Sequence, residues 1–143
     1  MKGLEPRISI VTLGVGDMKR ARGFYERLGW TAASSSNDDV TFFNMGGVVF
    51  GLYGRKALAE DAQTGFSPAA FTGVSLAHNC ESEERVDEVM ARAESSGAKV
   101  MKPPEKTFWG GYSGYFSDPD GHLWEVACNP LFPLDEHGRI TAP

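Results

Sequence analysis

The sequence of 143 residues contains little cysteine, no excess of positive charge and no long hydrophobic run. Its two cysteines, Cys80 and Cys128, are too few for a disulfide framework and are expected to be reduced thiols. Lysine and arginine number 14 against 19 aspartate and glutamate residues, so neither nucleic acid nor an anionic membrane is an expected partner. The apolar run at residues 8–15 is far shorter than the ~20 residues of a membrane span. With no small-residue cleavage site after a charged start, the sequence predicts a cytoplasmic protein.

Several chemical signatures are also missing. The sequence has no Gly-x-Ser-x-Gly nucleophile motif, no phosphate-binding loop and no dinucleotide fingerprint. Its composition, 41% hydrophobic and 23% charged, is that of a soluble globular protein. The length predicts a single domain over residues 1–143. Glycine is abundant, with 17 residues, which predicts tight turns and close backbone approaches.

The sequence contains the same series of predicted elements twice: one strand, one helix and then three strands. The first copy, residues 7–54, has a helix between an N-cap at Asp17 and a C-cap at Gly29. Its predicted strands are 7–15, 30–34, 40–44 and 48–53. The second copy, residues 72–130, has a helix between Ser82 and Gly97, and its predicted strands are 73–79, 99–102, 111–117 and 122–128. Residues 118–121 predict a type I turn.

These two copies predict an α+β fold in which two βαβββ modules form a half-open, barrel-like cleft. The polar, small-residue stretch 55–71 is expected to be a linker, and the proline-containing stretch 131–143 an extended tail. Side chains alternate across a strand, and three residues of the first strand are expected to face the cleft: Ile10, Thr12 and Gly14. On the last strand Glu125 shares the cleft side with Leu123 and Ala127, which makes it a lone carboxylate in an apolar row.

Two long motifs carry a resemblance to a known superfamily. The segment Thr12–Asp17, TLGVGD, followed by Gly23–Trp30, GFYERLGW, resembles the opening of vicinal oxygen chelate proteins. The segment Phe108–Val126 resembles their closing strands, and the match covers about residues 7–130. This superfamily includes glyoxalase I, the bleomycin resistance proteins and extradiol dioxygenases. The resemblance implies paired βαβββ modules, which serve isomerases, epimerases, dioxygenases, thiol transferases and binding proteins alike.

Most of those activities depend on a bound metal ion, so the metal ligands distinguish the enzymes from the binding proteins. Enzymes of the superfamily generally place a His, Gln or Glu ligand on the first strand of each module and a Glu or His on the fourth. The corresponding positions in this sequence are Ile10, Phe50, Val74 and Glu125. Only Glu125 can bind a cation, and a shift of one residue, to Val11, Gly51 or Ser75, supplies no better ligands. The sequence therefore predicts no cofactor, with a divalent metal as the alternative.

A second set of metal ligands is a weaker interpretation. His78 and Cys80 are two residues apart and share one face of a strand, as a ligand pair would. A pocket-lining or hydrogen-bonded His78, with Cys80 and Cys128 as small buried thiols, is the favoured interpretation.

Aromatic residues indicate the expected ligand-binding surface. Trp109 and Tyr112 flank two glycines, and such glycines allow a ligand close to the backbone. The predicted ligand-binding residues are Phe50, Tyr53, His78, Trp109, Tyr112, Tyr115 and Glu125. Glu125 is also the candidate catalytic residue, as a general base, and the alternative is a carboxylate that is hydrogen-bonded to a strand neighbour or a tyrosine hydroxyl.

The favoured function is binding of a small amphipathic or aromatic molecule in the cleft without metal. The alternative is a lyase, isomerase or dioxygenase, either metal-assisted or using Glu125 as acid and base. A third class is an interaction module with a vestigial cleft. The edges and apolar faces of the small sheets, together with the habit of the superfamily, predict a homodimer.

Overall fold

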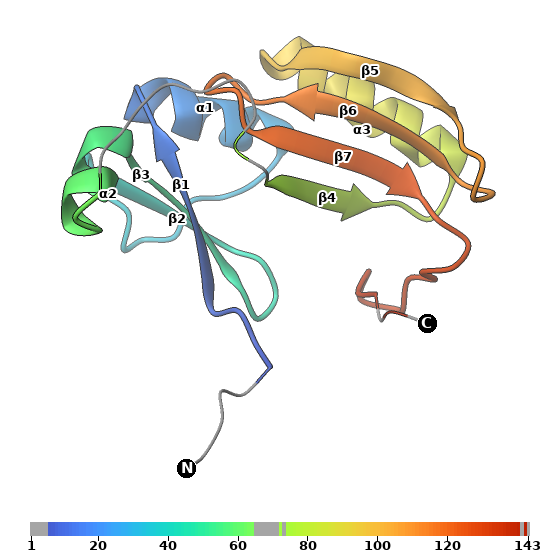
Figure 1. Ribbon diagram of the computed structural model, residues 1–143, viewed down its shortest axis with the longest axis horizontal. Helices are drawn as coiled ribbons and strands as arrows, with labels where there is room; N and C mark the ends of the chain where they lie inside the picture. The colour runs from blue at the N-terminus through green and yellow to red at the C-terminus, as the bar shows by residue number, and fades with distance from the viewer. Residues whose placement is uncertain (1–5, 65–71, 73, 141, 143) are drawn as a thin grey trace. The chain divides into compact units, whose positions relative to one another are not determined.

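The computed structural model describes residues 6–64, 72, 74–140 and 142 (Figure 1). It contains two compact units, residues 1–68 and 69–143, each with its own small sheet. The order of elements is β1 (Ile10–Val15), α1 (Met18–Leu28), β2 (Val40–Asn44), β3 (Val49–Gly54), α2 (Arg55–Asp61), β4 (Ser75–Asn79), α3 (Glu83–Ser96), β5 (Lys99–Lys106), β6 (Tyr112–Ser117) and β7 (Leu123–Cys128). The predicted α+β class is confirmed, whereas the cleft between the modules stays a prediction.

The first unit is a three-stranded sheet in the order β1-β3-β2, with α1 against one face. The Asp17 side chain accepts a hydrogen bond from the Arg20 amide at 3.0 Å, and Gly29 ends α1 with a φ of 116°, so both predicted caps are confirmed. The core under α1 is largely aromatic, because Phe24, Tyr25 and Phe43 are completely buried.

The predicted strand at 30–34 is wrong. The Ala33 amide donates to the Phe42 carbonyl at 2.7 Å, and among the described residues this is the one backbone bond between residues 30–34 and β2. Beyond it, side chains also bond to the β2 backbone, since Ser36 Oγ accepts from the Phe42 amide and Asn37 Oδ1 accepts from the Val40 amide. Such local side-chain bonds compete with strand pairing, and the first sheet therefore has three strands.

The first seven residues of the predicted linker at 55–71 form the helix α2. This helix contacts β1 and β3. A Cβ atom on Gly14 would lie 2.9 Å from the Arg55 Cβ and 3.6 Å from the Leu58 Cδ2, so the missing side chain is what admits α2. Most of the remaining expected linker, residues 65–71, lies outside the described residues.

The second unit is a four-stranded sheet in the order β4-β7-β6-β5, with α3 against one face (Figure 1). Ser82 caps α3 by accepting from the Arg85 amide at 3.1 Å, and Gly97 ends it with a φ of 117°. The predicted turn is confirmed by a 2.9 Å bond from the Gly121 amide to the Asp118 carbonyl. β5 continues past its predicted end through two prolines and two register shifts, which an edge strand tolerates.

Each sheet has a helix-covered face, against α1 or α3, and an opposite face, called here the open face. The helix α2 packs against the first open face at Gly14. Strand register identifies the members of each face, since directly paired residues point the same way. The first open face includes Ile10, Thr12, Phe42, Gly51 and Tyr53. The second open face includes Ser75, Ala77, Ser113, Tyr115, Leu123 and Glu125. No helix in the described part of the chain combines the length and apolar character needed to cross a membrane.

Candidate functional site

A hydrogen-bonded tyrosine and glutamate occupy the middle of the second open face. Tyr115 on β6 and Glu125 on β7 are directly paired, and the Tyr115 hydroxyl donates to Glu125 Oε2 at 3.2 Å. Desolvation raises the pKa of Tyr115, and the charge of Glu125 and the hydrogen bond raise it further. The hydroxyl therefore stays protonated and donating at neutral pH, and Glu125 is its acceptor. This arrangement is the hydrogen-bonded alternative that the sequence left open for Glu125.

The residues around this pair are mostly small. Ala77 on β4 is paired with Glu125 from the other side, and Ser113 on β6 is paired with Ala127. On β5, Lys102 is paired with Tyr115, and its Nζ lies 2.9 Å from Glu105 Oε1. The site thus offers a carboxylate acceptor, a hydroxyl oxygen whose proton is donated to that carboxylate, and a nearby ammonium group above a floor of small side chains. The position of Ala77 and Ser113 beside Glu125 follows from the pairing of β4, β6 and β7, which alternation along a single strand does not give.

The structure also corrects the register of the internal repeat. Asp17 and Ser82 are equivalent N-caps 65 residues apart, so the partner of Ile10 in the second module is Ser75 rather than Val74. In the same way Thr12 pairs with Gly51 where Ala77 pairs with Glu125. The counterpart of Glu125 is therefore Gly51, not Phe50.

The corrected positions do not fit the divalent ion that enzymes of the superfamily hold. Ile10 and Gly51 have no donor atom, and the Ser75 hydroxyl donates to the Leu76 carbonyl at 3.4 Å. Glu125 is then the one ionisable ligand among the four positions. Across the described ranges, no three His, Cys, Asp or Glu side chains gather in a metal-binding group. Divalent ions in proteins need several convergent donors in fixed geometry, which this set does not supply.

Phe50 lies on the helix-covered face of the first sheet, and not on its open face. It is paired with Val11 and is 4% exposed. Its ring centroid lies 5.0 Å from that of Tyr25 and 5.4 Å from that of Trp30. Phe50 is a core residue, because a strand that places Val11 toward the helix places its direct partner there too. Tyr53, three residues later, lies half-buried on the first open face.

His78 lies on the opposite side of its sheet from Glu125. It is paired with Val126, whose side chain points to the helix-covered face. His78 is exposed at the edge strand, yet desolvation lowers its pKa and the positive charge of Arg85 lowers it further. The structure therefore does not bring His78 into contact with the Tyr115–Glu125 pair.

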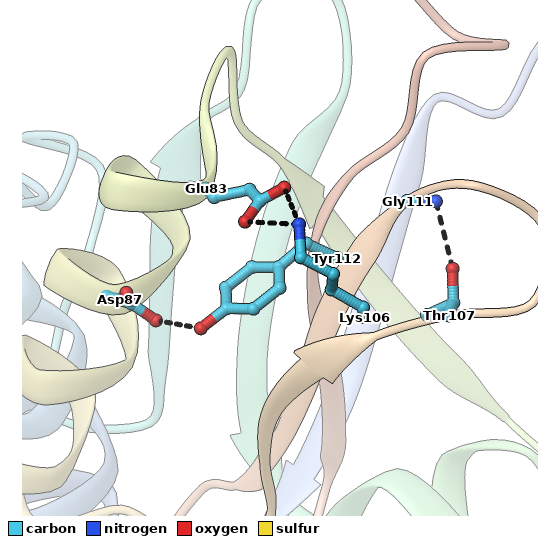
Figure 2. Close-up of polar contacts among 6 residues, drawn as sticks. All are labelled: Glu83, Asp87, Lys106, Thr107, Gly111 and Tyr112. Atoms are coloured by element: carbon cyan, nitrogen blue, oxygen red, sulfur yellow. Dashed lines mark hydrogen bonds and ion pairs between the residues drawn. The ribbon is translucent and has the colours of Figure 1, made fainter.

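Tyr112 also faces the helix-covered side, where it binds α3 (Figure 2). Its hydroxyl donates to Asp87 Oδ1 at 2.7 Å, which raises the pKa of Tyr112. Its strand partner Lys106 places Nζ 3.1 Å from Glu83 Oε2, one helical turn away from Asp87. These two contacts hold the turn end of the β5–β6 hairpin against α3.

Trp109 lies in the turn of that hairpin. The Gly111 amide donates to Thr107 Oγ1 at 3.0 Å, as Figure 2 shows. The Trp109 ring packs directly on Gly111, since a Cβ atom there would lie 1.7 Å from the ring atom Cζ3. The glycine therefore accommodates the Trp109 ring itself. Phe108, beside it at the turn, is fully exposed.

A further hollow lies in the first unit and had no signal in the sequence. It has a volume of about 480 Å³ and is lined by Met18, Lys19, Arg22, Glu26, Asn37 and Asp38. Its charges are of both signs, and Arg22 Nε lies 3.4 Å from Glu26 Oε1. We place the candidate site at Tyr115 and Glu125 instead, where a half-buried carboxylate and its donor share a face with apolar side chains.

Comparisons with known proteins agree with this fold. The chain is 27% identical over 137 residues to the metallothiol transferase FosB of Shouchella clausii strain KSM-K16, with coverage of 95% of this chain and 89% of that protein. It is 33% identical to a glyoxalase-related enzyme from Fulvimarina pelagi, with a TM-score of 0.89 and coverage of 97% and 100%. A lactoylglutathione lyase from Agrobacterium tumefaciens, 24% identical with a TM-score of 0.68 and coverage of 90% and 97%, shares the fold. The model of the Glyoxalase/Bleomycin resistance protein/Dioxygenase superfamily matches residues 7–126. The resemblance is thereby confirmed, and the chain belongs to this superfamily.

Proposed function

We propose that the protein binds a small amphipathic or aromatic molecule on the second open face without the help of a metal ion. The observation that carries the proposal is the half-buried Tyr115–Glu125 hydrogen bond in the centre of a face of small residues. A carboxylate accepts several hydrogen bonds, so Tyr115 uses only part of the capacity of Glu125. The remaining capacity suits an N–H, O–H or cationic group of a ligand.

The apolar part of such a ligand has a surface to contact. Tyr115 and Leu123 are half-buried on this face, and Ala77 is exposed. An aromatic ring or short aliphatic chain can pack against the Tyr115 ring while a polar group reaches Glu125. The combination favours ligands with one hydrogen-bond donor beside an apolar body.

The test is a ligand panel measured by thermal shift and followed by calorimetry. A ligand at 100 times its Kd should stabilise the protein by about 2.7 kcal/mol. The Glu125→Gln variant should weaken binding of a cationic or donor ligand by about 10-fold or more, because a hydrogen bond to a charged group contributes roughly 1.5–3 kcal/mol. Tyr115→Phe should have a smaller effect in the same direction.

The matched control is Glu94→Gln, which removes the same charge from an exposed position on α3. It should leave affinity unchanged. Ligands whose affinity is insensitive to Glu125→Gln and Tyr115→Phe would place binding elsewhere and contradict the proposal. If no compound of a broad panel shifts the Tm, the result would favour the interaction module with a vestigial cleft.

Metal content separates this proposal from the enzymes of the superfamily. We expect protein dialysed without chelator to carry well below one equivalent of Zn, Ni, Mn or Fe by elemental analysis, because the four aligned positions offer a single ionisable ligand. Adding these ions should leave the Tm unchanged. A stoichiometric metal that is lost in Glu125→Gln would overturn the proposal.

The second candidate function is catalysis, and the likeness to a metallothiol transferase over nearly the whole chain favours it. In that case Glu125 acts as acid and base in a lyase, isomerase or dioxygenase reaction, or in thiol transfer. Thiol addition to small electrophiles should then be measurable and should fall strongly in Glu125→Gln but not in Glu94→Gln. Binding that is sensitive to Glu125 without any turnover would favour the first candidate.

We also propose that the protein is a homodimer. Each small sheet has two edge strands, and several large apolar side chains are exposed, among them Ile10 at 53% and Val74 at 59%. Pairing of two chains would cover such surfaces. Light scattering at micromolar concentration should give twice the 15.5 kDa of one chain, and a species of 15.5 kDa alone would refute the dimer.

A further inference from the structure

The two cysteines of the chain lie at the ends of neighbouring strands in the second unit. β4 and β7 are parallel, and the last pair in their register is Asn79 with Ala127. The Cys80 amide continues this ladder by donating to the Ala127 carbonyl at 2.7 Å. One step further along both strands therefore sets Cys80 directly opposite Cys128.

The side chains of this pair point to the same side of the sheet. Alternation gives Cys80 the orientation of His78 and gives Cys128 that of Val126, and these two residues are paired. Neighbouring strands lie about 4.8 Å apart, which is within the range of roughly 4.4–6.8 Å between Cα atoms that a disulfide spans. Both thiols are free in this structure.

We propose that Cys80 and Cys128 form an intramolecular disulfide when the protein is exposed to a peroxide, which crosslinks β4 to β7. The proposal is independent of the ligand site, because the two thiols lie on the opposite side of the sheet from Glu125. It assigns a chemical role to the only two cysteines of the sequence.

The different environments of the two thiols set the order of events. Cys80 is 5% exposed, whereas Cys128 is half-buried and open to a small oxidant. Desolvation, the negative charge of Glu81 and the proximity of Cys128 raise the pKa of Cys80 to about 11. Since the thiolate is the form that attacks peroxide, Cys128 reacts first and Cys80 resolves the product.

Two steps complete the reaction. The Cys128 thiolate attacks one peroxide oxygen, so that an S–O bond forms, the O–O bond breaks and hydroxide leaves, giving a sulfenic acid. The Cys80 thiol then attacks the Cys128 sulfur, so that the S–S bond forms, the S–O bond breaks and water leaves once the thiol proton is transferred. The two thiols together lose two electrons, and the peroxide is reduced to water. A thiol reductant reverses the crosslink.

The crosslink should be visible in stability. It closes a loop that contains α3, β5 and β6, and closing a long loop restricts the unfolded chain. The edge strand β4 also becomes covalently attached to the central strand β7. Oxidised protein should therefore melt several degrees above reduced protein.

The experiment treats the full chain with hydrogen peroxide under non-denaturing conditions, then blocks free thiols and maps the peptides by mass spectrometry. We expect a Cys80–Cys128 crosslinked peptide, loss of both free thiols, and a rise in Tm that a reductant removes. Cys80→Ser should stop at a Cys128 sulfenic acid that a dimedone probe traps. Cys128→Ser should leave Cys80 reduced.

Either of two results would overturn the proposal. One is that folded wild-type protein keeps both thiols under peroxide that oxidises free cysteine. The other is that oxidation gives only disulfides between chains, which non-reducing electrophoresis detects as dimers. Circular dichroism of each variant before treatment establishes that the variant is folded. If Cys80→Ser does not fold, Cys80→Ala provides the same test.

Discussion

Phe42 and Phe43 are neighbours on β2 that point to opposite faces of the first sheet, so they test how the faces are assigned. Phe43 is completely buried, and its ring centroid lies 5.5 Å from that of Trp30 and 6.1 Å from that of Tyr25. Phe42 is half-buried on the open face and paired with Gly51. The two residues are chemically identical, and only the face to which they point differs.

Truncation of each side chain to alanine should give very different losses of stability. Removing a fully buried phenyl ring loses about 1.5–3 kcal/mol of transfer free energy, and the lost aromatic contacts and the cavity bring the total for Phe43→Ala to about 3–5 kcal/mol. Phe42→Ala loses part of the transfer term without creating a closed cavity, which gives about 1 kcal/mol. At roughly 4 °C per kcal/mol for a chain of this length, Tm should fall by about 12–20 °C and 4 °C respectively.

Urea unfolding followed by circular dichroism and by tryptophan fluorescence is the assay. Trp30 is in contact with Phe43 and reports on the first unit. Phe43→Leu, which keeps most of the side-chain volume, should recover more than half of the loss. Equal losses for Phe42→Ala and Phe43→Ala, or a larger loss for Phe42→Ala, would refute the assignment of the faces.

Three further predictions concern the second unit. Desolvation and the charge of Arg85 lower the pKa of His78 from its usual 6.5, so the unfolded state takes up a proton before the folded state as the pH falls. The free energy of unfolding should therefore decrease below about pH 6.5. In His78→Gln the urea midpoint should depend less on pH between about pH 7 and 5 than in the wild type. Gly111→Ala would place a methyl group 1.7 Å from a Trp109 ring atom, so the ring must move into solvent and its fluorescence should shift to the red; an unchanged spectrum would contradict the packing. Ser82→Ala removes the cap of α3 and should lower the free energy of unfolding by about 1 kcal/mol, measured by urea unfolding, and Ser82→Asp should restore it.

The sequence by itself determined the elements that depend on local interactions. The boundaries of α1 and α3 follow from caps within one turn, Asp17 and Gly29 for the first and Ser82 and Gly97 for the second. These bonds join residues three or four positions apart, so no distant part of the chain is needed to predict them. Alternation along β7 likewise predicted that Glu125 faces the opposite side of the sheet from Trp124 and Val126.

Tertiary structure decided what depends on a partner across the sheet or on a helix. Residues 30–34 read as a strand, but they have only one ladder bond to β2, whereas residues 55–61 become helical against β1. Phe50 belongs to the core because its partner Val11 faces α1. Tyr112 and Tyr115 are three residues apart on β6 and so face opposite sides, but the contact with Asp87 of α3 decides that the side of Tyr112 is the covered one. A sequence specifies which residues alternate, but only pairing with a neighbouring strand and the position of the helix fix which face is buried.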